Sequence, residues 1–250
     1  MFVEWIDTTH GTDSLSLIDA TTLESLDTVR FHSFRSMVVI FGGATHQPYD
    51  EDHDGSIGDP VGGFFTGGAA NREGIFDVAT NLYVQGWDVY PYNEDEVDDD
   101  LDLPFVEITN AIDRRFVGFD FDTNVGGIAI MGFSQGGGAT HDLIRRLWQE
   151  RNITTDFGMY LDAVEHDLPE PTLPETRNPL GLFSLLNIYQ RLGPFVGNEI
   201  NPDTETGFLE EYNVTTDPGW NNSLNHHLID DDLQVRQAIR IRLQEHLRSR

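Results

Sequence analysis

The 250-residue chain has no cysteine, no lysine and no long apolar run. Without cysteine it forms no disulfide, no catalytic thiolate and no cysteine-based zinc site. All 15 basic side chains are arginine, and without lysine the chain lacks the Gly-Lys-Ser/Thr element of a phosphate-binding P-loop. No apolar run is long enough to cross a bilayer, so we expect no stable membrane insertion.

Acidic side chains greatly outnumber basic ones. The 43 Asp and Glu against 15 Arg give a net charge of −28, which repels phosphate backbones and argues against a nucleic-acid partner. Crowded carboxylates repel one another less when salt screens them, so the composition also suggests adaptation to high salt. The first residues are too acidic for a signal peptide, so the default expectation is a soluble cytoplasmic protein, or else an excised domain.

Strand-like and helix-like segments alternate along the chain, which predicts an α/β fold with a mostly parallel central sheet flanked by helices. The length fits one domain over 1–250. Strands are expected at 36–41, 87–90, 126–131, 157–161 and 183–189, and helices at 71–85, 104–117, 136–150 and 231–248.

Residues 168–225 are expected to contain irregular segments that form an insertion, a cap or a lid, because long loops often cover binding sites. The stretch from 193 to 225 is rich in Gly, Asn, Pro and Thr. Four aromatic residues are candidates to line an acyl channel there: Phe183, Phe195, Phe208 and Trp220.

The segment Gly132-Phe133-Ser134-Gln135-Gly136 matches the pattern G-x-S-x-G. A buried strand precedes it and a helix follows it, which is the context that a nucleophile turn requires. Glycine at both ends lets the strand and the helix approach each other closely. Such a turn exposes the Ser134 hydroxyl above the sheet and aims the backbone N–H of Gln135 at a developing oxyanion.

A serine nucleophile needs a histidine to take its proton, and the histidine needs a carboxylate to orient it. In chains that carry such a strand-to-helix turn, called a nucleophile elbow, the acid follows the serine along the sequence and the histidine follows the acid. His226 and His227, just before the last helix, therefore become the candidate bases. His226 lies further out in its loop and is preferred, while His227 remains open.

Asp162 is the preferred acid, because it ends the strand expected at 157–161 and so stands above the carboxyl edge of the sheet. Glu165 and Asp167 are nearby alternatives. An acid after the following strand would instead be Glu199 or Asp203.

The elbow Gly-Phe-Ser-Gln-Gly-Gly at 132–137 resembles that of α/β-hydrolase carboxylesterases, acyl-protein thioesterases and cutinases. The Leu161-Asp162 strand end resembles lipases of the animal pancreatic type, whose acid follows the strand after the elbow. In the loop 41–46, which resembles the Gly-rich loops of lipases, Gly43 or Ala44 would donate the second oxyanion hydrogen bond.

This resemblance implies an α/β-hydrolase fold and a small-molecule ester or thioester as substrate, cleaved through an acyl-enzyme at Ser134. The chemistry requires no cofactor. Two other interpretations remain open, a non-catalytic ligand-binding domain on the same fold and an acyltransferase in which an alcohol replaces water.

Residues 50–57 match the first eight positions of an EF-hand calcium loop, in which alternate oxygen ligands surround the ion. Position twelve is Val61 instead of a bidentate Glu, so the sequence predicts a looser structural Ca²⁺ site that Asp59 completes. The predicted ligands are Asp50, Asp52, Asp54, Ser56 and Asp59.

Overall fold

The computed structural model describes residues 11–18, 25–33, 36–43, 74–85, 87–92, 101–116, 127–164, 176–201 and 207–248. Within these segments, six strands form the central sheet in the order β4-β3-β5-β6-β7-β8, and every neighbouring pair is parallel. The strands are β3 (Met37–Phe41), β4 (Asp88–Tyr92), β5 (Ile128–Phe133), β6 (Thr155–Leu161), β7 (Leu182–Tyr189) and β8 (Phe208–Asn213). The prediction of a mostly parallel sheet is confirmed.

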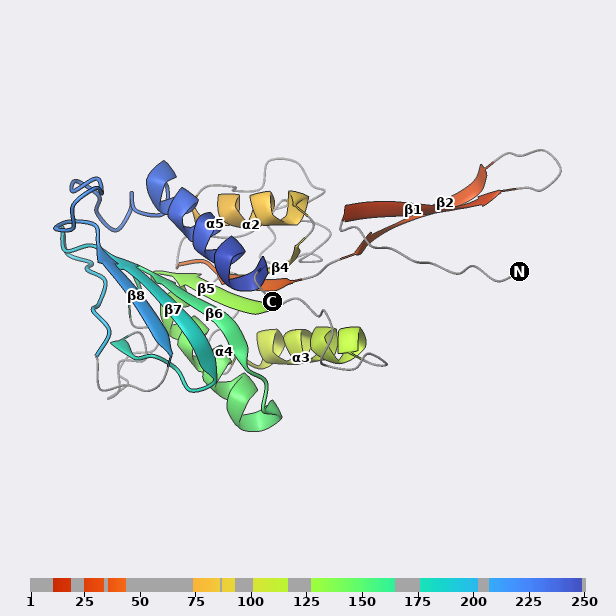
Figure 1. Ribbon diagram of the computed structural model, residues 1–250, viewed down its shortest axis with the longest axis horizontal. Helices are drawn as coiled ribbons and strands as arrows, with labels where there is room; N and C mark the ends of the chain where they lie inside the picture. Colours follow the sequence, from red (N-terminus) through yellow and green to blue (C-terminus); the bar gives the residue numbers. More distant parts are fainter. Residues whose placement is uncertain are drawn as a thin grey trace, which may run out of the picture.

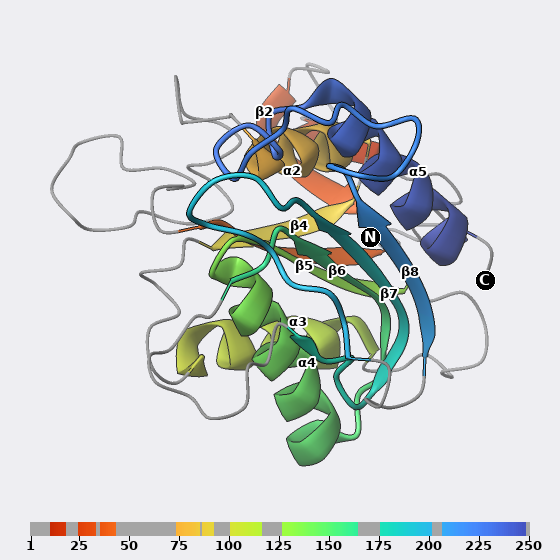
Figure 2. The same ribbon diagram turned by 90° about the vertical axis from the view of Figure 1, so that its left-hand side faces the viewer.

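Helices cover both faces of this sheet, so the predicted α/β layering is also confirmed (Figure 2). One face carries α2 (Ile75–Val84) and α5 (Leu233–Arg248), and the other carries α3 (Asp102–Phe116) and α4 (Gly136–Arg151). None of the helices in the described segments is long and apolar enough to span a membrane.

The central strands are buried on both faces, which explains their uninterrupted apolar sequences. Successive side chains of a strand point to opposite faces. In β5, Met131 and Phe133 pack into the apolar cluster under α2 and α5, whereas Ile130 packs into the cluster under α3 and α4. Because β3 and β5 pair in parallel, their carboxyl ends lie at the same edge of the sheet, whose two faces both carry apolar clusters.

Two strand regions differ from the sequence-based expectation. The stretch 193–225 was predicted to be irregular, but it contains β8, which pairs with β7 and forms one edge of the sheet. In β8 the sequence Phe-Leu-Glu-Glu-Tyr-Asn is exposed or half-buried, so it lacks the apolar run of the central strands. That part of the proposed cap therefore belongs to the sheet.

The N-terminal strands β1 (Gly11–Ile18) and β2 (Ser25–Ser33) form an antiparallel pair that was not predicted from the sequence. They make a two-stranded sheet of their own, and Figure 1 shows this ribbon extending away from the central sheet. It contributes no strand to the edge at which the candidate site lies.

Candidate active site

Ser134 lies at the turn between β5, which ends at Phe133, and α4, which begins at Gly136. Its φ of 56° is in the left-handed region, which a residue with a side chain rarely adopts and which costs on the order of 1–3 kcal/mol. Backbone hydrogen bonds hold the turn. The Ser134 N–H donates to the carbonyl of Leu161 (3.1 Å), and the Ser134 carbonyl accepts from the N–H of Val164 (3.0 Å).

Close packing explains the two glycines of the motif. A Cβ atom at Gly132 would overlap the carbonyl oxygen of Gly136. A Cβ atom at Gly136 would lie 2.7 Å from the carbonyl oxygens of Phe41 and Gly42, at the end of β3. Since these neighbours are backbone atoms that cannot easily move, no larger residue fits at either position.

The structure brings Ser134, His226 and Asp162 together in one line of hydrogen bonds. The Ser134 hydroxyl lies 2.8 Å from Nε2 of His226, and Nδ1 of His226 lies 2.7 Å from Oδ2 of Asp162. A carboxylate only accepts, so Nδ1 carries the hydrogen and Nε2 is left to accept the serine proton. All three side chains are buried, Asp162 completely.

The Asp162 carboxylate is held by more than the histidine. It follows β6 directly, with a φ of 46° that turns the chain out of the strand. Its Oδ1 accepts the backbone N–H groups of Gln190 (3.0 Å) and Gly197 (2.9 Å), and its Oδ2 also accepts the Gln190 side-chain amide (2.8 Å). With His226, four N–H donors face one buried carboxylate.

Of the other candidates for the base and the acid, the structure describes His227 and Glu199. His227 is exposed, and its ring is edge-on to that of Phe195 at 6.3 Å. Glu199 is also exposed. Glu165, Asp167 and Asp203 lie outside the described residues.

Two backbone segments next to Ser134 are candidates to hold an oxyanion. The N–H of Gln135 stands at the start of α4, where N–H groups have no partner within the helix and the helix dipole is positive. A Cβ atom at Gly43 would lie 3.3 Å from the Ser134 hydroxyl oxygen, so the backbone after β3 passes against the serine. Ala44, the other predicted donor, lies outside the described residues.

Two phenylalanine rings contact the imidazole of His226. Phe133 is buried and stacks on it with ring centroids 5.1 Å apart. Phe195 lies 5.7 Å away and is 53% exposed. It therefore offers an apolar surface to solvent beside Ser134, His226 and Asp162, which are called the triad below. Of the four aromatic residues predicted to line an acyl channel, Phe195 is the one whose described contacts include the triad.

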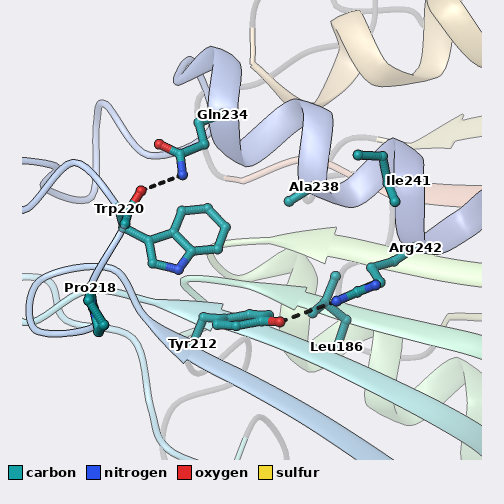
Figure 3. A pocket seen from close by; sticks show the side chains of 9 residues that line it. Leu186, Tyr212, Pro218, Trp220, Gln234, Ala238, Ile241 and Arg242 are labelled. Atoms are coloured by element: carbon teal, nitrogen blue, oxygen red, sulfur yellow. Dashed lines mark hydrogen bonds between the residues drawn. The ribbon is translucent and has the colours of Figure 1, made fainter.

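Trp220 instead lines a separate pocket of about 350 Å³ between β8 and α5 (Figure 3). Its ring lies 5.3 Å from that of Tyr212, and Gln234 of α5 donates to the carbonyl of Gly219 at the pocket rim (2.6 Å). Arg242 closes one side, where it contacts the carboxylates of Glu210 and Glu245. None of the triad residues lines this pocket.

The predicted calcium ligands all lie outside the described residues, so the calcium site stays a prediction. These residues are Asp50, Asp52, Asp54, Ser56 and Asp59. Within the described part of the chain, no group of three or more His, Asp or Glu side chains is arranged to hold a metal ion.

Comparison with known proteins adds little to this geometry. No family model and no curated protein matches the chain. A crystal structure of a SOBER1 variant from Arabidopsis thaliana is similar over 84% of this chain and 99% of that chain, with 10% sequence identity and a TM-score of 0.36. A similarity this distant assigns neither a family nor a function.

Proposed function

We propose that this protein is a serine hydrolase of the α/β-hydrolase type, which cleaves carboxylic esters or thioesters through an acyl-enzyme at Ser134. The observation that carries the proposal is the buried line from the Ser134 hydroxyl through His226 to Asp162, with contacts of 2.8 and 2.7 Å. Distances of this size suit proton transfer from a nucleophile to a base that a carboxylate orients.

In the acylation step the Ser134 oxygen attacks the carbonyl carbon while Nε2 of His226 takes the hydroxyl proton. The imidazolium that forms faces the Asp162 carboxylate, and the backbone N–H of Gln135 and the backbone at Gly43 face the new oxyanion. The imidazolium then donates its proton to the departing alcohol or thiol. In deacylation, water attacks the acyl carbon while His226 takes one of its protons. The bond between the acyl carbon and the Ser134 oxygen then breaks, His226 returns the proton to Ser134, and the carboxylic acid leaves.

Charge and the exposed ring of Phe195 favour one class of substrate. A net charge of −28 disfavours anionic substrates, so we expect neutral esters. The exposed ring of Phe195 lies beside His226, where it can contact an apolar group attached to the scissile carbonyl. These features support small neutral esters with an apolar acyl or alcohol group.

A fluorophosphonate probe tests the proposal directly, because it forms a covalent bond only with an activated serine. We expect mass spectrometry to locate the label on Ser134, the variant Ser134→Ala to remain unlabelled, and p-nitrophenyl esters of rising chain length to be hydrolysed. If the folded protein is neither labelled nor active, the site is a binding site instead. If, in the presence of an added alcohol, the new ester forms faster than the free carboxylic acid is released, the protein is an acyltransferase.

A further inference from the structure

Gln190 follows β7 directly and is completely buried. Its side-chain amide is fully engaged: the nitrogen donates to Oδ2 of Asp162 (2.8 Å) and to the carbonyl of Phe195 (2.6 Å), and the oxygen accepts the N–H of Leu192. Its backbone N–H donates to the second oxygen, Oδ1, of Asp162 (3.0 Å). One residue therefore contacts both oxygens of the candidate catalytic acid.

The hydrogen bonds from Gln190 bear on the orientation of the Asp162 carboxylate relative to the His226 ring. The terminal torsion of an aspartate is broad, so the side chain alone does not fix the plane of its carboxylate. Here Oδ2 receives two donors, Nδ1 of His226 and the amide of Gln190, while Oδ1 receives two backbone N–H groups. Because each of the two oxygens accepts two hydrogen bonds, the plane of the carboxylate is held at both oxygens, and Gln190 donates to each of them.

The same amide also holds the segment that carries Phe195. Gln190 donates to the Phe195 carbonyl, and Gly197 donates its N–H to Asp162. A Cβ atom at Gly197 would overlap Oδ1 of Asp162, so this segment lies directly against the carboxylate. The acid and the exposed ring beside His226 are therefore joined through Gln190.

We propose that Gln190 is a positioning residue, which orients Asp162 toward His226 and fixes the Phe195 segment to the same carboxylate. The inference rests on the proposed serine hydrolase function. In this chain the position after β7 carries an amide, which holds the acid that β6 supplies.

The test compares two substitutions with a control. Gln190→Met keeps the length of the side chain but removes its hydrogen bonds, and Gln190→Glu keeps its shape. Gln85→Met changes an exposed glutamine at the end of α2 and is the matched control. We would measure kcat and KM on p-nitrophenyl acetate, the rate of fluorophosphonate labelling, and the proton resonance of His226 Nδ1.

For Gln190→Met we expect kcat to fall about 10- to 100-fold, the usual effect of losing one hydrogen bond to a charged group, with KM little changed. The low-field Nδ1 resonance should shift or broaden. A glutamate at 190 donates to Asp162 only while protonated and repels it when ionised. The activity of Gln190→Glu relative to the original protein should therefore fall as pH rises, which a purely structural role does not predict.

The outcomes separate the two proposals. If the original protein is labelled at Ser134 but Gln190→Met keeps its kcat and its resonance, the role of Gln190 is wrong and the hydrolase function stands. If the original protein is not labelled, the hydrolase function fails and the role of Gln190 falls with it. If Gln190→Met does not fold, Gln190→Glu decides, since a pH-independent activity ratio would overturn the inference.

Discussion

Gly43 and Ser134 lie so close that a Cβ atom on the glycine would come within 2.8 Å of the Cβ atom of the serine. They follow the adjacent strands β3 and β5, which are paired up to Phe41 and Gly132. A side chain at 43 would have to displace Ser134, the proposed nucleophile, or the backbone that is expected to hold the oxyanion.

Gly43→Ala should therefore lower kcat strongly while the protein still folds. Loss of one oxyanion donor costs about 100-fold or more in kcat, and we expect a loss of that order. Gly219→Ala is the control: its φ of 96° strains any side chain, but nothing lies within 4 Å of the added atom, so it should lower the melting temperature and leave kcat unchanged. Equal activity of the two variants would contradict an oxyanion role for this backbone.

The two adjacent histidines should differ sharply in their effect on activity. His226→Ala removes the group 2.8 Å from the Ser134 hydroxyl and should reduce kcat by about 1000-fold or more. His227→Ala removes an exposed ring and should change kcat by only a small factor. Steady-state kinetics and probe labelling of both variants check this, and the reverse ranking would mean that the base was assigned to the wrong residue.

Alkaline pH should weaken the contact between β8 and α5. The hydrogen bond from Tyr212 to Glu210, together with burial, raises the pKa of Tyr212 above its ordinary value of 10.0. A raised pKa in the folded state means that the stabilisation is present below about pH 10 and is lost as pH rises through the folded-state value. Urea unfolding at about pH 8 and pH 11 should show a smaller alkaline loss of stability for Tyr212→Phe than for the original protein.

Salt should stabilise the fold, because 43 acidic side chains against 15 arginines repel one another in the compact state. Raising NaCl from about 0.1 M to about 1 M shortens the screening length from about 10 to about 3 Å. We expect the midpoint of thermal unfolding to rise steadily over this range. A midpoint that does not respond to salt would exclude salt adaptation.

The sequence predicted the features of the site that depend on local pattern. The elbow around Ser134 follows an apolar strand and precedes a helix, and Asp162 directly follows the next strand, so their placement above one sheet edge followed from the strand order. From the sequence, the one reason to prefer His226 to His227 was that His226 lies further out in its loop. The contact with Ser134 depends on how that loop returns over the sheet, which no local pattern encodes.

Two features escaped prediction for physical reasons. An edge strand such as β8 needs no apolar face on both sides, and its Glu-Glu-Tyr-Asn sequence looks like a loop. Gln190 belongs to no sequence motif. The role of a single glutamine after a strand depends on its three-dimensional contacts, here with Asp162 and Phe195.

The triad is built from residues that are distant along the chain: 92 positions separate Ser134 from His226, and 64 separate Asp162 from His226. Closing such long loops is entropically costly, so we expect contacts of this kind to form late in folding. His226 also follows β8, the edge strand of the sheet. During refolding, the proposed esterase activity should therefore return after the helical signal, and the rate at which it returns measures the completion of the whole sheet.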